Sequence, residues 1–325
     1  MEQAAEPRRA IVVAGPTCSG KSALALDLAR RLGGTVINAD SMQVYRELRV
    51  LTARPTSAEE ATAPHALYGV RPAALPGSVA WWRAAALEAM AGAAVPILCG
   101  GTGLYFQALA TGLADVPDPG EPARAEARAL LESLGPAALH ARLSAADPAT
   151  AARLRPTDRQ RIARAWEVWR GTGRGLAAWQ AASPAPSGWR FLTILLDPPR
   201  PDLRAAIAAR FAAMLANGAV AEARALADLE LDPALPAMRA HGVPELMAYL
   251  RGELVLAEAV RRAVLAIGQY TKRQATWFRH HHIADPNHTH IICARCSDKT
   301  QFSESLEHSL LTFLNTRLDR PASRG

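Results

Sequence analysis

Residues 15–22 have the types and the spacing of a phosphate-binding loop. They read Gly-Pro-Thr-Cys-Ser-Gly-Lys-Ser and fill every fixed position of the pattern G-x-x-x-x-G-K-[ST]. Glycines let such a loop fold tightly around an anion, so that backbone N–H groups and a helix N-terminus point at phosphate oxygens. Lys21 would add a charge on the terminal phosphate, and the Ser22 hydroxyl would be the metal ligand that holds Mg²⁺. The predicted diphosphate-binding residues are Gly15, Pro16, Thr17, Cys18, Ser19, Gly20, Lys21 and Ser22.

The elements that must position this loop are present on both sides of it. The apolar, β-branched residues 10–14 predict a buried parallel strand, and residues 22–32 predict a helix with a Leu/Ala face that ends at Gly33-Gly34. The alternative is an ordinary glycine-rich turn, which the filled pattern and the correct flanks disfavour. We therefore expect the chain to bind a di- or triphosphate.

Two further predicted strands end in residues that could join this site. Residues 35–38 lead into Asp40-Ser41-Met42-Gln43, and residues 95–99 lead into Gly100-Gly101-Thr102-Gly103. The carboxyl ends of parallel strands converge on the ligand, which places Asp40 near the loop. By itself Asp40 could equally be a helix or turn cap, and the second glycine cluster could be a simple strand-to-helix turn. Together the strand ends offer amides, a carboxylate and a hydroxyl, which make a plausible active site.

The pattern of elements changes between residues 116 and 187. Strand signals vanish there, and the firmest helix covers residues 157–170, with Arg161 and Arg164 three apart on one face. That pair could meet phosphates or could be an ordinary solvated face. A strand signal returns at residues 191–196. We therefore predict an α/β fold: a P-loop-containing parallel sheet core flanked by helices, with an inserted all-helical lobe and a helical C-terminal part. The expected parts are 8–115 and 189–284 for the core, 116–188 for the lobe, and 285–325 for a tail of unknown role.

Composition limits the classes of function. The chain has 325 residues and a formal net charge of +7, which permits a polyanionic partner without requiring one. Four cysteines fit a reduced cytosolic protein better than a disulfide scaffold. No stretch is apolar enough to span a membrane, and the N-terminus lacks the form of a secretion signal. We expect a cytoplasmic protein without a membrane partner.

Two segments near the C-terminus have their own patterns. Residues 270–279 mix basic and aromatic side chains, a composition that suits contact with a nucleic-acid backbone and base stacking. The tail contains His288-x-His290-x-x-Cys293-x-x-Cys296, whose cysteine pair has a zinc-ligand spacing. Its histidines are crowded too close to the cysteines, so we do not predict zinc there.

The ordered motifs resemble those of the tRNA isopentenyltransferase family over about residues 8–283. Besides the phosphate loop and residues 40–45, they include Thr52-Ala53-Arg54-Pro55, Pro64-His65, Gly100-Gly101-Thr102-Gly103-Leu104-Tyr105, Asp158-Arg159-Gln160-Arg161, Gly171-Thr172-Gly173-Arg174 and Lys272–Arg279. The loop alone would be unspecific, whereas the ordered set is highly specific.

The resemblance implies transfer of a dimethylallyl group from dimethylallyl diphosphate to the exocyclic amine of the adenosine 3′ of the anticodon, with Mg²⁺ and release of diphosphate. It implies Asp40 as general base, Lys21 and Thr102 as further catalytic residues and, less firmly, Arg210 as a diphosphate clamp. The expected partner is the tRNA anticodon stem-loop, and the expected state is a monomer. The tRNA contacts that the resemblance implies are Asp40, Ser41, Met42, Gln43, Thr102, Arg124, Gln160, Arg161, Ile162, Ala163, Arg164, Met238, Arg239, Ala240, His241, Gly242, Val243, Lys272, Arg273, Gln274, Thr276, Trp277, Phe278 and Arg279.

The chain also departs from the family pattern. Leu51 replaces a frequent Gly, Ile267-Gly268 replaces a Thr-Arg pair, and residues 242–245 lack the commoner Tyr-Lys. Two other classes share part of the evidence. A P-loop small-molecule kinase or ATPase would explain residues 8–110 but not the Arg-rich lobe or the basic–aromatic segment. A non-catalytic RNA-binding protein would leave Asp40 without a role.

Overall fold

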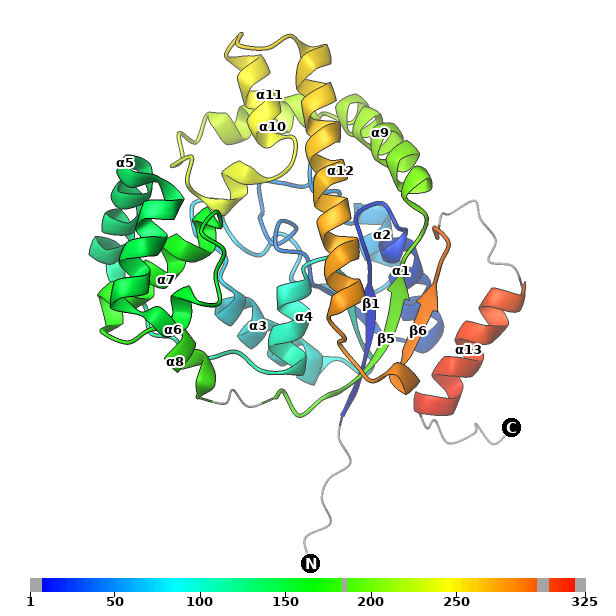
Figure 1. The fold of residues 1–325 in the computed structure, drawn as a ribbon. Helices are drawn as coiled ribbons and strands as arrows, with labels where there is room; N and C mark the ends of the chain where they lie inside the picture. The colour runs from blue at the N-terminus through cyan, green and yellow to red at the C-terminus, as the bar shows by residue number, and fades with distance from the viewer. Residues whose placement is uncertain (1–7, 183–185, 297–303, 319–325) are drawn as a thin grey trace, which may run out of the picture. The chain divides into compact units, whose positions relative to one another are not determined.

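The computed structural model describes residues 8–182, 186–296 and 304–318, and it confirms the predicted α/β fold. The core is a six-stranded, fully parallel sheet in the order β3-β2-β4-β1-β5-β6, of which β1, β5 and β6 are labelled in Figure 1. The strands are β1 (Arg9–Ala14), β2 (Thr35–Asn38), β3 (His65–Ala66), β4 (Pro96–Gly100), β5 (Arg190–Leu196) and β6 (Thr289–Ile292). The four predicted strands are present, and the edge strands β3 and β6 are additions to the prediction.

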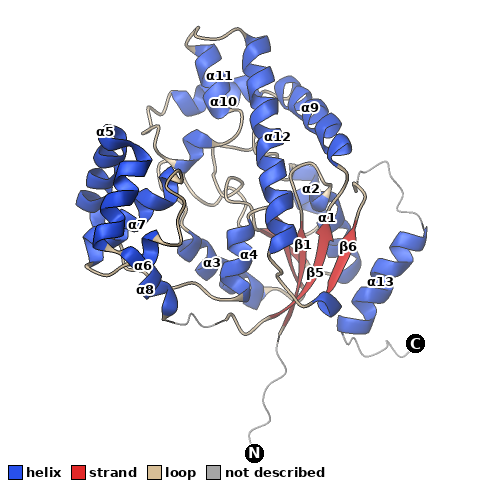
Figure 2. Cartoon of the chain, viewed as in Figure 1, coloured by secondary structure: helices blue, strands red, loops and turns tan. Residues whose placement is uncertain are grey.

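The two faces of the sheet are covered by different helices because side chains alternate along each strand. Ile11 and Val13 of β1 belong to the apolar cluster that contains α1 (Lys21–Leu32) and α13 (Glu304–Leu318). Val12, which lies between them in sequence, belongs to the cluster on the other face. The helices of that cluster, drawn in blue in Figure 2, are α3 (Val79–Gly92), α4 (Gly103–Ala110), α9 (Arg200–Ala216), α10 (Ala219–Ala227), α11 (Val243–Leu250) and α12 (Leu256–His280).

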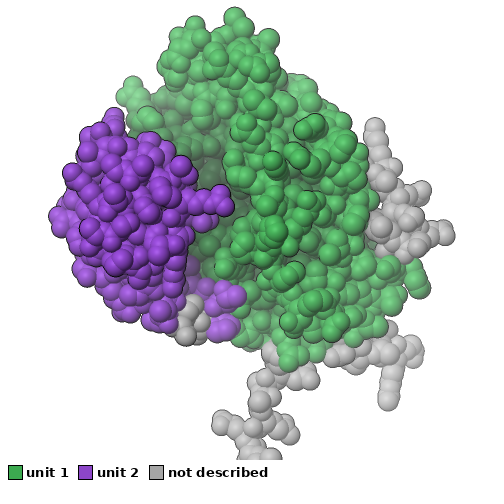
Figure 3. Space-filling model, in the orientation of Figure 1, with its two compact units in different colours: residues 1–110, 187–325 green, residues 111–186 purple. Residues whose placement is uncertain are grey.

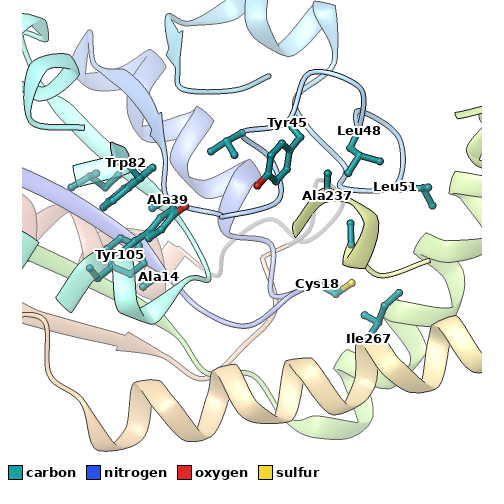
Figure 4. Packing of buried hydrophobic residues seen from close by; sticks show 14 of the residues in the cluster. Ala14, Cys18, Ala39, Tyr45, Leu48, Leu51, Trp82, Tyr105, Ala237 and Ile267 are labelled. Carbon is teal, nitrogen blue, oxygen red and sulfur yellow. The ribbon is translucent and has the colours of Figure 1, made fainter. Parts of the chain in front are cut away.

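A stacked aromatic pair fixes the end of β2. The rings of Trp82 and Tyr105 lie parallel at 4.0 Å, both buried (Figure 4). Nε1 of Trp82 donates a hydrogen bond of 2.8 Å to the backbone oxygen of Asn38. The backbone that leads from β2 into Asp40 is therefore held by a buried donor.

Local signals in the sequence set several helix boundaries. Ser78 caps α3 by accepting from the N–H of Trp81, and α1 ends at Gly33, whose φ is 64°. The remaining short elements are α2 (Ser57–Thr62) and the 3₁₀ turns η1 (Pro236–Arg239) and η2 (Pro286–His288). Among the described residues no single helix is long and apolar enough to cross a membrane; α9 and α10 reach that length and composition only together, across a bend of 68°.

The chain divides into two compact units, residues 1–110 with 187–325, and residues 111–186 (Figure 3). The sequence placed the inserted lobe at 116–188. The described residues of the second unit form helices only: α5 (Gly120–Ala146), α6 (Pro148–Ala151), α7 (Arg159–Thr172) and α8 (Leu176–Ala181). α5 is broken at Gly135, which has a φ of 77° and is followed by Pro136. The unit has its own apolar core, in which Leu139 and Ile162 are fully buried.

Candidate active site

The phosphate-binding loop lies between β1 and α1, as the sequence predicts, and its shape depends on left-handed residues. Cys18 has a φ of 67° and Gly20 a φ of 92°. A side chain at Gly20 would place Cβ 1.6 Å from the backbone oxygen of Cys296, so this position admits only glycine. The N–H of Ser19 turns back to the oxygen of Pro16 at 3.2 Å. Because α1 begins at Lys21, its N-terminal N–H groups are directed at the loop.

Gln274 of α12 connects this loop to the second glycine-rich loop. Its Oε1 accepts hydrogen bonds from the N–H and from the hydroxyl of Thr17, at 2.9 and 3.0 Å. Its Nε2 donates to the backbone oxygen of Gly101 at 2.9 Å. The side chain is only 4% exposed. Every polar atom of a buried amide needs a partner, so this arrangement fixes both loops against α12.

Asp40 and Thr102 lie on adjacent strand ends and are joined through the backbone. The Thr102 hydroxyl accepts from the N–H of Ser41 at 3.0 Å. Oδ1 of Asp40 accepts from the N–H of Met42 at 2.9 Å, and Asn38 Oδ1 accepts from the N–H of Asp40 at 2.8 Å. The second oxygen of Asp40 has no hydrogen bond within the part of the chain that the structure describes. That oxygen is the group that could accept a proton.

A cluster of cations surrounds the loop. The burial of Lys21 lowers the pKa of its ammonium group, and the nearby carboxylate of Asp40 opposes that shift. The guanidinium of Arg210, from α9, lies 3.8 Å from the sulfur of Cys18. Both cations line a cavity of about 540 Å³, which the side chains of Arg54 and Arg295 also line. Such a cavity is suited to a polyphosphate.

The oxygen donors of this cavity fit Mg²⁺ better than a transition metal. The described residues contain no group of three or more His, Cys, Asp or Glu side chains that could hold an ion. The exposed hydroxyl of Ser22, which contacts the thiol of Cys99, lies in the first turn of α1. Mg²⁺ keeps several waters and takes most of its other ligands from phosphate, so one protein hydroxyl is enough. The two tail cysteines with a zinc-ligand spacing differ in exposure, since Cys293 is exposed and Cys296 is buried.

Residues 238–243 approach the site through an aromatic contact. The ring of His241 lies 4.8 Å from that of Tyr270, and burial lowers the pKa of this histidine. Tyr270 lies near the side chains of Thr102 and Gln274, and burial raises the pKa of its phenol. The tyrosine therefore stays neutral beside the two loops.

The basic–aromatic segment of α12 has an exposed face and a buried face. Lys272, Arg273 and Thr276 are exposed, as is Arg279, which forms two hydrogen bonds with Asp197. Trp277 is half-buried against Gly103, where a Cβ would lie 2.2 Å from its ring. This close approach explains why a glycine opens α4.

Part of the predicted tRNA-contact set is buried in the structure, and its contact with tRNA stays a prediction. Side chains in the core have little surface to offer a macromolecule. The composition of a motif does not reveal which helix face points inward. The predicted contacts that the structure buries are Ile162, Ala240, Gly242, Val243, Gln274 and Phe278.

The other predicted contacts of the first unit keep some exposed surface, and their contact with tRNA stays a prediction. Arg239 is exposed, while Ser41, Met42 and Met238 are half-buried. Gln43, also half-buried, donates to the oxygens of Thr52 and Ala53 and thus supports the following turn.

In the second unit the predicted contacts lie at the start of α7 and on α5. Gln160 and Arg161 are exposed, and Ala163 is half-buried. Arg164 is 3.3 Å from Glu167, and Arg124 pairs with Asp118. Exposed ion pairs of this kind are weak and would be exchanged for phosphate contacts at little cost.

Sequence reasoning missed two cations of the cavity. Arg54 belongs to the motif at residues 52–55, so the motif itself held a signal. Arg295 belongs to the tail, for which no pattern indicated a role.

Comparison with known proteins gives consistent matches. The family model "IPP transferase" matches residues 43–281, and the model "Isopentenyl transferase" matches residues 8–66. A tRNA dimethylallyltransferase of Granulibacter bethesdensis is 62% identical over 312 residues, which are 94% of this chain and 98% of that protein. One of Acidiphilium cryptum is 60% identical, over 95% of both chains.

Solved structures agree with the fold. The tRNA isopentenylpyrophosphate transferase of Bacillus halodurans has a TM-score of 0.65 and 30% identity, over 95% of this chain and 97% of that one. A eukaryotic dimethylallyltransferase acting on tRNA has a TM-score of 0.77 over 97% of this chain and 80% of that one. At its identity of 23% that likeness shows the fold alone.

The Gln274 bridge yields a first prediction. Gln274→Ala leaves the Thr17 and Gly101 groups without partners, so we expect the free energy of unfolding to fall by about 1–3 kcal/mol and diphosphate binding to weaken. Gln274→Glu keeps the acceptor for Thr17 but places a carboxylate oxygen, in place of the donor, against the backbone oxygen of Gly101. It should therefore also destabilise the protein. Urea unfolding and calorimetric titration with diphosphate measure the two effects.

The exposed Gln269 of the same helix is the matched control. Gln269→Ala should leave both quantities near those of the parent protein. A Gln274→Ala variant with parental stability and diphosphate affinity would show that the bridge does not hold the loops.

Proposed function

The chain belongs to the IPP transferase family, the tRNA isopentenyltransferases, and we propose that it is a tRNA dimethylallyltransferase. It transfers a prenyl group to tRNA. The finer proposal is that the donor is dimethylallyl diphosphate, that the acceptor is the exocyclic amine of the adenosine 3′ of the anticodon, and that diphosphate is released.

One observation carries this proposal: the carboxylate of Asp40 lies close to the cations of the phosphate loop. One oxygen of this carboxylate has no hydrogen bond within the described residues. Asp40 influences the pKa of Lys21, and Thr102 ties the loop of Asp40 to the next strand end. A leaving diphosphate and a proton acceptor at one edge of a sheet suit substitution at an allylic carbon. The kinase or ATPase alternative shares the loop but is not favoured, because the relatives are named for prenyl transfer to tRNA.

In the proposed reaction the adenine nitrogen attacks the first carbon of the prenyl group. A C–N bond forms as the C–O bond to diphosphate breaks, and the electron pair of that bond leaves on the bridging oxygen. The free oxygen of Asp40 accepts the proton that the amine loses, as a general base. The bond from the Met42 N–H holds the carboxylate in position for this step.

The leaving group is stabilised by charge that the loop holds in place. Lys21, the N–H groups at the start of α1 and the guanidinium of Arg210 face the diphosphate. Negative charge builds on the bridging oxygen in the transition state, so these groups act more strongly there than on the bound substrate. Mg²⁺ would be held by the Ser22 hydroxyl and by phosphate oxygens, and when bound it supplies further neutralisation of that charge.

We propose that the exposed basic residues bind the anticodon stem-loop. On α12 these are Lys272 and Arg273; on α7 they are Arg161 and the half-buried Arg164. Phosphate contacts of this kind position the RNA without reading its sequence. We further propose a monomer that acts in the cytoplasm, because a single chain supplies the whole catalytic set and tRNA is found there.

The direct test is to incubate the protein with labelled dimethylallyl diphosphate, Mg²⁺ and unmodified tRNA, and to digest the RNA. Prenylated adenosine is the expected product. A parallel reaction with labelled ATP and no prenyl donor tests the kinase alternative. Phosphoryl transfer or ATP hydrolysis without prenyl-adenosine would reject the proposal.

The role of Asp40 gives a second prediction. Asp40→Ala should retain diphosphate and tRNA binding but lose turnover on the order of a hundredfold or more, because the proton acceptor is removed. Asp40→Asn is the matched variant: it keeps an acceptor for the Met42 N–H but cannot take a proton, and it should be impaired as well. Turnover within about threefold of the parent enzyme would reject the general-base role.

Lys21 gives a third prediction. Lys21→Ala should weaken binding of dimethylallyl diphosphate and slow the reaction, since the ammonium contacts both the bound substrate and the leaving group. The exposed Lys272→Ala loses the same charge away from the cavity and should leave diphosphate affinity unchanged. If Lys21→Ala changed neither affinity nor rate, the loop would not be the donor site.

The basic face of α7 gives a fourth prediction. Replacing Arg161 and Arg164 with Ala should raise KM for tRNA and flatten its salt dependence by roughly one unit of slope for each lost phosphate contact. KM for dimethylallyl diphosphate should hardly move. The exposed pair Arg142 and Arg153 of the same unit, replaced by Ala, controls for charge alone. A parental KM and salt slope in the first double variant would identify its residues as an ordinary solvated face.

A further inference from the structure

The stretch Cys293–Cys296 connects the edge of the sheet to the phosphate-binding loop. It follows β6, whose last residue, Ile292, accepts a hydrogen bond of 2.9 Å from the N–H of Asp197. β6 runs parallel to β5 and β1, so its carboxyl end lies on the same side of the sheet as the loop, which follows β1. The function proposed above assigns no role to this stretch.

Three contacts fasten the stretch to the loop. The N–H of Cys296 donates to the oxygen of Ser19 at 2.9 Å, and Nε of Arg295 donates to the oxygen of Cys18 at 2.9 Å. Gly20 approaches so closely that any side chain would collide with the backbone of Cys296. The buried side chain of Cys296 packs in the apolar cluster of α1 and α13, and this packing holds the stretch in place.

These contacts bear on the direction of the loop amides. The oxygen of Ser19 and the N–H of Gly20 belong to one planar peptide group and point to opposite sides of it. Because the N–H of Cys296 holds the Ser19 oxygen on its own side, the Gly20 N–H is turned to the opposite side of that peptide group. The stretch therefore fixes the direction of one backbone donor of the loop.

Arg295 also brings a charge to the cavity of Lys21, Ser22 and Arg210. It and Arg210 approach Cys18 through different atoms, Arg295 at the oxygen and Arg210 at the sulfur. Within the described part of the chain, the Cys18 oxygen is the only hydrogen-bond partner of Arg295, and no carboxylate pairs with it. The remaining N–H groups of this half-buried guanidinium are available to a ligand.

We propose that Arg295 is a further diphosphate-binding residue, which holds the loop through Cys18 and donates its other N–H groups to diphosphate oxygens. A guanidinium suits both tasks because its donors form a planar fork that matches phosphate oxygens. The inference rests on the proposed function, since it takes the cavity to be the site of the diphosphate of the prenyl donor.

Calorimetric titration with inorganic diphosphate tests this assignment directly. Arg295→Met should weaken binding about tenfold or more, and Arg295→Lys should fall between it and the parent protein. KM for dimethylallyl diphosphate should rise in parallel, while KM for tRNA stays unchanged. The matched control is Arg30→Met, an exposed arginine at the far end of α1.

The outcomes separate this inference from the proposed function. If the parent protein bound diphosphate and made prenyl-adenosine but Arg295→Met did both equally well, the inference alone would be overturned. A lower thermal midpoint with parental diphosphate affinity would make Arg295 purely structural and overturn it too. If the parent protein bound ATP through Arg295 and made no prenyl-adenosine, the proposed function would fail together with the assignment to the prenyl donor.

Discussion

The buried amide of Gln274 is the interaction on which the rest of the site depends. An amide has acceptor and donor groups at its two ends, and inside a protein each must find a partner. Here the acceptor holds Thr17 of the phosphate loop and the donor holds Gly101 of the second glycine-rich loop. Two strand ends and one helix are thus fixed to each other, and Asp40, which we propose as the general base, follows the neighbouring strand β2.

Because Gln274 lies on α12, the proposed function gives this helix two ligands. Its buried face holds the loop that we assign to the donor diphosphate, and its exposed face carries Lys272 and Arg273, which we assign to tRNA. Between them, Tyr270 lies near Thr102, at the strand end beside Asp40. If both assignments hold, a single helix positions the two substrates relative to each other.

The sequence was sufficient where structure is local. The phosphate loop, its flanking strand and helix, and the cap at Ser78 follow from short patterns and are present. The sequence was insufficient where a contact between residues far apart in the chain determines the structure. The short edge strand β6 has four residues, of which only Ile292 is buried, so no buried apolar run marks it. The position of Gln274 in a basic–aromatic segment suggested RNA contact, since composition does not reveal which side of a helix is buried.

The bond between Cys18 and Arg295 joins residues 277 positions apart. The loop leaves the ribosome early, whereas the stretch that fastens it emerges 277 residues later. Contacts of such sequence separation form late, because the intervening chain must first be ordered. During most of its synthesis the protein therefore has a phosphate loop in sequence but not in its final shape. The share of donor affinity that we assign to Arg295 is therefore gained only when β6 joins the sheet.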